Sequence, residues 1–150
     1  MAKTNAPFAI FGHIGPKLEA VLAYWRALRR GAADMPFADD LSIPSVEHLG
    51  SEVFLLDVFV RPERFRLSEA AVGLTMQDED RILGKFIDEV NLPTPFELLR
   101  AQASATVEHM RPTLYTHEPV KASDQAYDRL LLPAWEGGEV RLLLGAVERR

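Results

Sequence analysis

The fold is decided by a stretch near the C-terminal end, which runs from Gln125 to Val147 and reads QAYDRLLLPAWEGGEVRLLLGAV. Its middle, Glu136–Glu139, contains two adjacent glycines, and paired glycines accept the positive φ angles of a two-residue hairpin turn. The leucine triplets at 130–132 and 142–144 place apolar side chains on both faces of the flanking strands. A sheet with one face in water alternates apolar and polar residues instead. The stretch therefore predicts a β-hairpin in a sheet that is covered on both faces.

The rest of the chain divides into shorter periodic segments. The expected helical segments are residues 17–30, one short turn within 31–50, short helical stretches within 69–76 and 84–90, and a longer helix from Pro95 to Met110. The expected strands are Glu52–Val60, Arg64–Ser68, Thr113–Val120, Gln125–Trp135 and Val140–Val147. All but one of the connections between strands are as short as hairpin turns, so we expect a five-stranded antiparallel sheet. The chain is then a mixed α/β protein, of the α+β type.

Two helices are candidates to cover this sheet. The longer helix has an apolar face that includes Phe96 and Met110 and a polar face that includes Gln102, and it covers one face of the sheet. The other face requires the N-terminal helix at 17–30 or a partner subunit. Arginines at the end of that N-terminal helix suit the negative end of its dipole.

The apolar stripe of the N-terminal helix has two interpretations. It packs on the domain's own sheet, or it forms a dimer interface, for which tryptophan and tyrosine are suitable anchors. Only the dimer interface predicts that Trp25→Glu gives a folded monomer. The interface candidates are Leu18, Val21, Leu22, Tyr24, Trp25 and Leu28.

Length and composition indicate one soluble domain. The chain has 150 residues, of which 47% are apolar and 26% are charged, which is typical of a globular protein. We assign residues 17–150 to a single domain and residues 1–16 to an N-terminal tail. We expect Phe8 and Phe11 of this tail to dock on the domain or on a second subunit.

Charge and composition also restrict the partners. The absence of cysteine excludes disulfides, thiolate zinc sites and cysteine nucleophiles. A net charge of −5 argues against nucleic-acid binding through phosphate neutralisation. The sequence has neither a secretory apolar region nor the run of about 20 apolar residues that a membrane span needs. We therefore expect a cytoplasmic protein with no nucleic-acid or membrane partner.

The sequence contains none of the patterns typical of hydrolytic or metal chemistry. The four histidines are His13, His48, His109 and His117. No two of them are four residues apart, and no carboxylate stands at a zincin spacing. The serines are scattered without a Gly-x-Ser-x-Gly elbow, and the acidic runs at 39–40 and 78–80 lie in expected loops. We expect no metal site, no catalytic residue and no enzymatic activity.

A set of polar residues on the expected strands remains: Asp57, Arg66, Tyr115, His117, Tyr127 and Arg129. Asp57 and Arg66 can face each other across the first hairpin as a cross-strand ion pair. Alternatively, Arg66 or Arg129 binds an anionic ligand or partner, because a guanidinium fork fits a carboxylate. The candidate ligand-binding residues are Arg66, Tyr115, His117, Tyr127 and Arg129.

Several short pieces of sequence occur in a recognisable order. They are Tyr24–Arg29 (YWRALR), Met35-Pro36, Phe54–Val58 (FLLDV), Phe65–Leu67 (FRL), Gly84–Glu89 (GKFIDE) and Tyr127–Pro133 (YDRLLLP). Together they resemble a small PAS-like family of largely uncharacterised alphaproteobacterial proteins, within the PAS-type sensory fold. The chain departs from that family at Ser68–Ala70, where a glycine is common, and at Pro133–Trp135, where Pro-Leu and a polar residue are common.

The resemblance implies a five-stranded antiparallel sheet with helices cupping a ligand cavity. It also implies a sensory module that binds small molecules or partner proteins, often as a dimer built on an N-terminal helix. A covalent flavin adduct is excluded because it needs a cysteine. Haem is not expected, because the one histidine on an expected helix, His109, suits the C-terminal end of that helix as a cation. The cofactor is left unidentified.

We therefore expect a non-enzymatic sensory or regulatory module that binds a small apolar or weakly acidic molecule, a signalling partner such as a histidine kinase, or both. We expect a homodimer. The alternative is a ligand-free protein-interaction module that dimerises through its apolar N-terminal helix and sheet face.

Overall fold

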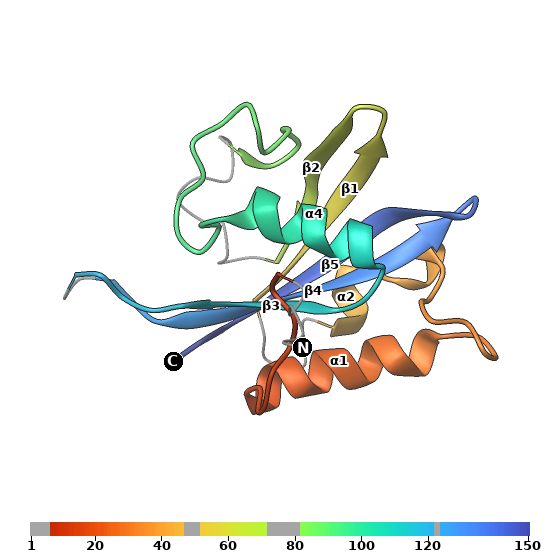
Figure 1. Cartoon of the computed structure of the whole chain (residues 1–150), viewed down its shortest axis with the longest axis horizontal. Coiled ribbons are helices and arrows are strands. Elements are labelled where there is room, and N and C mark those ends of the chain that lie inside the picture. Colours follow the sequence, from red (N-terminus) through yellow and green to blue (C-terminus); the bar gives the residue numbers. More distant parts are fainter. Residues whose placement is uncertain (1–6, 47–51, 72–81, 122–123) are drawn as a thin grey trace, which may run out of the picture.

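The computed structural model describes residues 7–46, 52–71, 82–121 and 124–150. Its centre is a five-stranded antiparallel sheet with the strand order β2-β1-β5-β4-β3 (Figure 1). The strands are β1 (Glu52–Val60), β2 (Glu63–Ala70), β3 (Thr113–His117), β4 (Tyr127–Glu136) and β5 (Glu139–Arg149). The helical elements are α1 (Pro16–Leu28), the 3₁₀ helix η1 (Ala38–Asp40), α2 (Ile43–Val46) and α4 (Leu99–His109). The predicted sheet and the α+β class are confirmed.

The predicted C-terminal hairpin is present. β4 pairs with β5, and the turn between them holds Gly137 at φ 62° and Gly138 at φ 81°. The side chains of residues 130–132 are each 0% exposed, although successive residues of a strand point to opposite faces. Both faces of this hairpin are therefore covered, as the leucine triplets predicted.

Two helices provide the cover. α4 lies against β4, β3 and β2, and α1 lies against β5 and β4 on the opposite side of the sheet (Figure 1). Trp25 anchors α1, because its indole Nε1 donates a 2.8 Å hydrogen bond to the carbonyl oxygen of Pro133. Glu148 of β5 accepts hydrogen bonds of 3.1 Å from the backbone N–H groups of Lys17 and Leu18. These N–H groups belong to the first turn of α1, where no intrahelical acceptor is available.

β1 and β5 pair through a close approach of a phenylalanine to a glycine. Phe54 of β1 is opposite Gly145 of β5, and its ring packs edge-on against Phe96 with the ring centroids 5.3 Å apart. A Cβ atom at position 145 would lie 2.2 Å from the Phe54 ring. Glycine at this position therefore gives the Phe54 ring the room to lie over β5.

The stripe of α1 packs on the chain's own sheet. Its four most apolar members, Leu18, Val21, Leu22 and Trp25, are at most 4% exposed. Of the two interpretations, intramolecular packing is the one observed for these four side chains, and it leaves them no surface for a second chain. Tyr24 and Leu28 are half-buried, and their contact with a second chain stays a prediction.

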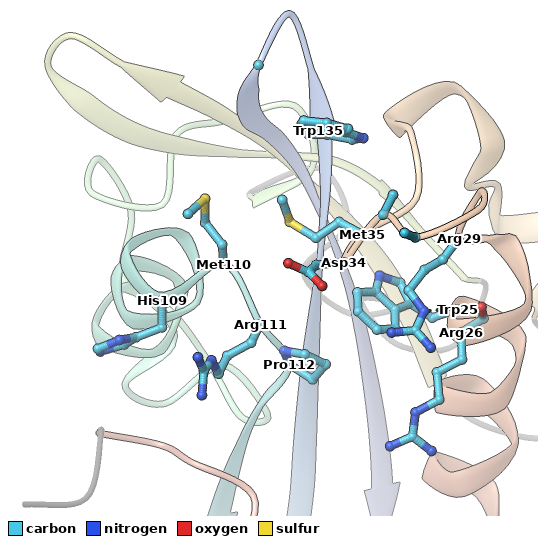
Figure 2. Close-up of a pocket in the computed structure, with 13 residues that line it drawn as sticks. Trp25, Arg26, Arg29, Asp34, Met35, His109, Met110, Arg111, Pro112 and Trp135 are labelled. Atoms are coloured by element: carbon cyan, nitrogen blue, oxygen red, sulfur yellow. Dashed lines mark hydrogen bonds between the residues drawn. The ribbon is translucent and has the colours of Figure 1, made fainter.

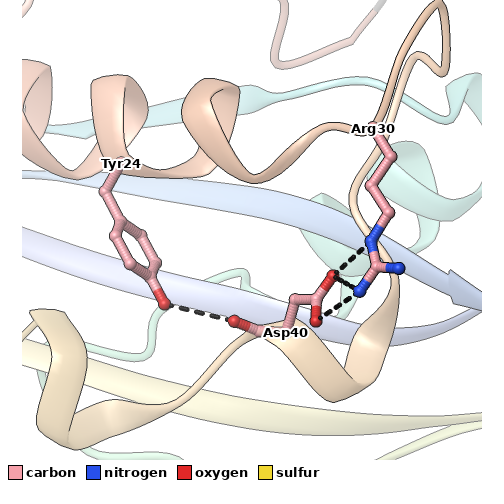
Figure 3. A network of polar contacts seen from close by, with 3 residues as sticks. All are labelled: Tyr24, Arg30 and Asp40. Carbon is pink, nitrogen blue, oxygen red and sulfur yellow. Dashed lines mark hydrogen bonds and ion pairs between the residues drawn. The ribbon is translucent and has the colours of Figure 1, made fainter.

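Tyr24 contacts the connector that follows α1. Its hydroxyl donates a 3.4 Å hydrogen bond to the carbonyl oxygen of Asp40, whose carboxylate forms a two-pronged ion pair with Arg30 at 2.9–3.1 Å (Figure 3). These contacts hold the connector against the end of α1.

The strand ends differ from the predicted ones. The expected helical stretch at 69–76 is wrong at its start, because Glu69 and Ala70 continue β2, and residues 72–76 lie outside the described part of the chain. β3 ends at His117 rather than Val120, β4 spans Tyr127–Glu136 and β5 extends to Arg149.

Residues 84–90 form turns instead of the expected helical stretch. Phe86 forms an isolated antiparallel β-bridge with Arg66 of β2. The backbone N–H of Ile87 donates a 2.9 Å hydrogen bond to the carbonyl oxygen of Phe65. The outer edge of β2 thus receives its hydrogen-bond partners from this segment, which cannot close helical hydrogen bonds at the same positions.

The predicted helix from Pro95 begins later, at Leu99. Leu98 has a left-handed backbone with φ 56°, so helical geometry cannot continue through it toward Pro95. Phe96 therefore reaches the core from a turn. Met110, at the end of α4, also has positive φ and is 53% exposed, so its predicted place on the apolar face is wrong.

One of the two tail phenylalanines docks on the domain. The backbone N–H of Leu114 donates a 2.7 Å hydrogen bond to the carbonyl oxygen of Phe8, whose ring lies 6.3 Å from that of Tyr115. Phe11 is 61% exposed.

Replacing Trp25 by alanine is expected to lower the free energy of unfolding by about 3–5 kcal/mol, because the change empties a buried site and removes the bond to Pro133. The exposed neighbour Arg26→Ala is the control and is expected to change stability by no more than about 0.5 kcal/mol. Urea unfolding followed by circular dichroism measures both variants. A Trp25→Ala variant as stable as the wild type would contradict the packing of α1 on the sheet.

Candidate functional site

The candidate residues separate into two places in the sheet. Asp57 of β1 and Arg66 of β2 are register partners, and Oδ2 of Asp57 accepts hydrogen bonds of 2.8 and 3.2 Å from Arg66. The side chains are 30% and 41% exposed, so this is a surface ion pair that contributes less than about 1 kcal/mol. Two strands, β1 and β5, separate Arg66 from β4. The remaining four candidates come together on β3 and β4: Tyr115, His117, Tyr127 and Arg129.

Arg129 lies at the buried centre of this group. Its side chain is 0% exposed, and its Nε donates a 2.8 Å hydrogen bond to Oε1 of Gln102. Nη1 donates a 2.9 Å hydrogen bond to the carbonyl oxygen of Pro95. Nη2 is buried and makes no well-aligned hydrogen bond to a described residue, although the nearby hydroxyl of Tyr127 favours the charged guanidinium. The guanidinium carbon lies 4.8 Å from the centre of the Tyr115 ring, within the range of a cation–π interaction.

The guanidinium of Arg129 forms no ion pair with a carboxylate of the described residues. Burial disfavours its charged form and lowers the pKa of Arg129 to about 10, while Tyr127, Tyr115 and Glu97 oppose this change. The group therefore remains protonated at neutral pH. A buried charge without a bonded counter-charge is costly, because desolvation is not compensated.

Three rings connect Arg129 with the surface. The hydroxyl of Tyr115 and Nδ1 of His117 share a 2.9 Å hydrogen bond, and His117 stacks on Tyr127 with the ring centroids 4.9 Å apart. Tyr115 meets Tyr127 edge-on at 5.9 Å. Tyr127 is fully buried, whereas Tyr115 and His117 are half-buried. The cluster thus reaches solvent along β3.

Gln102 belongs to this cluster, although the sequence placed it on the polar face of its helix. It is 0% exposed, and its Nε2 donates hydrogen bonds of 3.1 Å to Oγ1 of Thr113 and 3.0 Å to the carbonyl oxygen of Arg129. These partners explain why an amide is buried here. They lie on β3 and β4, so helical spacing alone could not reveal them. We call the group formed by Glu97, Gln102, Tyr115, His117, Tyr127 and Arg129 the Arg129 cluster.

Glu97 supplies the one carboxylate of the cluster. It accepts hydrogen bonds of 2.5 Å from the hydroxyl of Tyr127 and from Oγ1 of Thr94. Burial raises the pKa of Glu97, but the hydrogen bonds outweigh burial and hold this pKa below its ordinary value. Burial and the bond to Glu97 raise the pKa of Tyr127 far above its ordinary value, so its hydroxyl stays a neutral donor.

The other features that the sequence singled out lie away from this cluster. His109 ends α4, and His13 is in the exposed segment before α1, whereas His48 and the acidic run 78–80 lie outside the described residues. Over the described ranges, no group of three or more histidine, aspartate or glutamate side chains is arranged to hold a metal ion. None of the described helices is long and apolar enough to cross a membrane.

The structure also contains a groove that the sequence did not predict. It has a volume of about 730 Å³ and lies between the ends of α1 and α4 (Figure 2). We call it the end groove. Its labelled lining residues in Figure 2 are Trp25, Arg26, Arg29, Asp34, Met35, His109, Met110, Arg111, Pro112 and Trp135. In the sequence, the arginines of α1 suit the helix dipole, and no local spacing links them to Arg111.

The lowered pKa of Glu97 predicts a pH-dependent contribution to stability. A carboxylate whose pKa is lower in the folded state stabilises the fold above about pH 4.3, the ordinary value, and loses this contribution as the pH falls. Glu97→Gln is therefore expected to be less stable than the wild type at neutral pH, and the difference is expected to shrink as the pH falls below about 4.3. Urea unfolding across this pH range measures it, with the exposed Glu108→Gln on α4 as the control. A difference that does not change with pH would contradict the assignment.

Comparison with known proteins supports the fold. No protein-family model matches the chain, and no curated protein matches it in sequence. Its structure is similar to the crystal structure of sensory box sensor histidine kinase from Vibrio cholerae, with 11% identity over 89% of this chain and 97% of that chain, and a TM-score of 0.50. A fungal LOV domain photoreceptor matches with 11% identity over 89% of this chain and 91% of that chain (TM-score 0.48). An RNA-binding Light-Oxygen-Voltage receptor matches with 23% identity over 66% of this chain and 29% of that chain (TM-score 0.44). The strand order, the antiparallel pairing and the first of these similarities give the chain a PAS-like fold.

Proposed function

We propose that the chain is a non-enzymatic sensory module of the PAS type and that it binds a small acidic molecule at the Arg129 cluster. The observation that carries this proposal is the guanidinium of Arg129, which is buried, is charged at neutral pH and keeps an unpaired donor at Nη2. The sensory part is supported by the fold, because a solved structure of similar fold is that of a sensory box sensor histidine kinase.

A carboxylate suits this site for two physical reasons. It accepts a charge-assisted hydrogen bond from Nη2, and its negative charge compensates the buried guanidinium. Gln102 and the carbonyl of Pro95 already hold Nε and Nη1, so the free N–H points in a fixed direction. The cluster offers a cation and hydrogen-bond donors rather than a nucleophile beside a base, which favours binding over catalysis.

In this proposal the N-terminal segment reports binding. The ring of Tyr115 lies 4.8 Å from the guanidinium carbon of Arg129 and 6.3 Å from the ring of Phe8. A ligand that neutralises Arg129 weakens the attraction between Arg129 and Tyr115 and thereby shifts the docking of Phe8. A signalling partner, such as a histidine kinase or a second copy of the chain, then reads the change at the β3 edge.

Benzoate and pyruvate are the test ligands, and benzamide is the neutral match of benzoate. At saturation, at least one of the two carboxylates is expected to raise the Tm of the wild type by several degrees, and benzamide is expected to leave it unchanged. Arg129→Lys keeps the charge but loses the planar fork, so it is expected to weaken binding at least about tenfold by isothermal titration calorimetry.

Two further variants make this experiment decisive. Tyr115→Phe removes a hydroxyl at the half-buried rim of the site, disturbs the core less than a change at Arg129, and is also expected to weaken binding. Arg66→Lys is the matched control at a distant strand and is expected to bind as the wild type does. Unchanged binding by a folded Arg129→Lys variant, as judged by circular dichroism, would contradict a ligand at this cluster.

A further inference from the structure

The end groove is a second site that shares no residue with the Arg129 cluster. It lies where the C-terminal ends of α1 and α4 approach the turn of the β4–β5 hairpin. Figure 2 shows Trp25, Arg26 and Arg29 on one side and His109, Met110 and Arg111 on the other. Its volume of about 730 Å³ falls within the range of pockets that hold small organic ligands.

Positive charge gathers in this groove, although the chain has a net charge of −5. Arg26, Arg29 and Arg111 line it, and none of them takes part in an ion pair found among the described residues. Asp34 is the one carboxylate among the lining residues.

The negative ends of the helices compensate only part of this positive charge. α1 ends at Leu28 and α4 ends at His109, and each helix C-terminus carries about half a negative elementary charge. Together with Asp34, the two ends offset about two of the three guanidinium charges. The groove therefore keeps an excess positive charge that an anionic group would neutralise.

Apolar side chains also line the groove. Trp25 and Met35 are at most 7% exposed, and Arg29 lies over the Trp25 ring at 5.5 Å. Trp135 stacks on Phe37 with the ring centroids 5.6 Å apart, which fixes the indole plane.

We infer that the end groove binds a small organic anion with a flat apolar part, whose phosphate or carboxylate meets the guanidinium groups of Arg26, Arg29 and Arg111. The apolar part rests on Trp135, which is half-buried, and on Met110, which is 53% exposed. This site is additional to the one proposed at Arg129, and neither requires the other.

Tryptophan fluorescence reports on this groove directly, because the two tryptophans of the chain, Trp25 and Trp135, both line it. The probes are phenyl phosphate, benzoate, inorganic phosphate and benzyl alcohol. A saturable change with phenyl phosphate or benzoate supports the inference, and the tighter of the two identifies the anionic group. Inorganic phosphate is expected to bind more weakly because it has no ring. No response to either aromatic anion, or an equal response to uncharged benzyl alcohol, overturns the inference.

Arg111→Gln and Arg26→Gln are each expected to raise the Kd of the tighter probe about tenfold. Arg100→Gln removes an exposed charge of α4 outside the groove and is expected to leave the Kd unchanged. Arg26 is on the exposed side of α1, so its variant is informative even where Arg111→Gln fails to fold. An unchanged Kd in a folded Arg26→Gln variant overturns the assignment of the arginines.

Two controls distinguish binding in the end groove from binding at the Arg129 cluster and from binding of RNA. Arg129→Lys is expected to keep the fluorescence response, so failure at the Arg129 cluster and failure at the groove are distinguishable. A fluorescence response to a short single-stranded RNA without a response to either aromatic anion overturns the small-molecule assignment.

Discussion

The sheet depends on the pairing of β1 with β5, which joins the N-terminal hairpin to the C-terminal strands. This pairing requires Phe54 to lie over Gly145, where a Cβ atom would be 2.2 Å from its ring. The ring then meets Phe96, which precedes α4, so the same contact places α4 on its face of the sheet. β5 becomes a central strand buried on both sides, and α1 must therefore cover the second face.

The main features of this fold follow from local sequence patterns. The leucine triplets and the paired glycines predict the C-terminal hairpin and its two-sided cover, because strand alternation and turn conformation are local properties. The segments 69–70 and 84–90 could not be predicted in the same way. Residues 69–70 pair with β1, and residues 84–90 bond to the outer edge of β2, so both conformations depend on residues distant in sequence.

Of the candidate site, the residues on the strands could be predicted from the sequence, and the residues from α4 and the turn before it could not. Alternation along two adjacent strands places Tyr115, His117, Tyr127 and Arg129 on one face, and these four residues do come together. Glu97 and Gln102 escaped prediction because they join the cluster only when α4 and the turn before it pack on the sheet. The end groove is assembled from the ends of two helices and a hairpin, and no spacing within one element reveals it. The ion pair of Asp57 and Arg66 shows that alternation alone does not separate a surface pair from a site.

We propose that the buried charge of Arg129 serves a small acidic ligand. Comparing the native mass spectrum of freshly purified protein with its denatured mass tests this claim most directly. The wild type is expected to carry an excess mass per chain that disappears on denaturation. A folded Arg129→Lys variant is expected to carry this excess mass in a smaller fraction of its chains. A bare native mass in the wild type, or an excess mass equally abundant in Arg129→Lys, would contradict it.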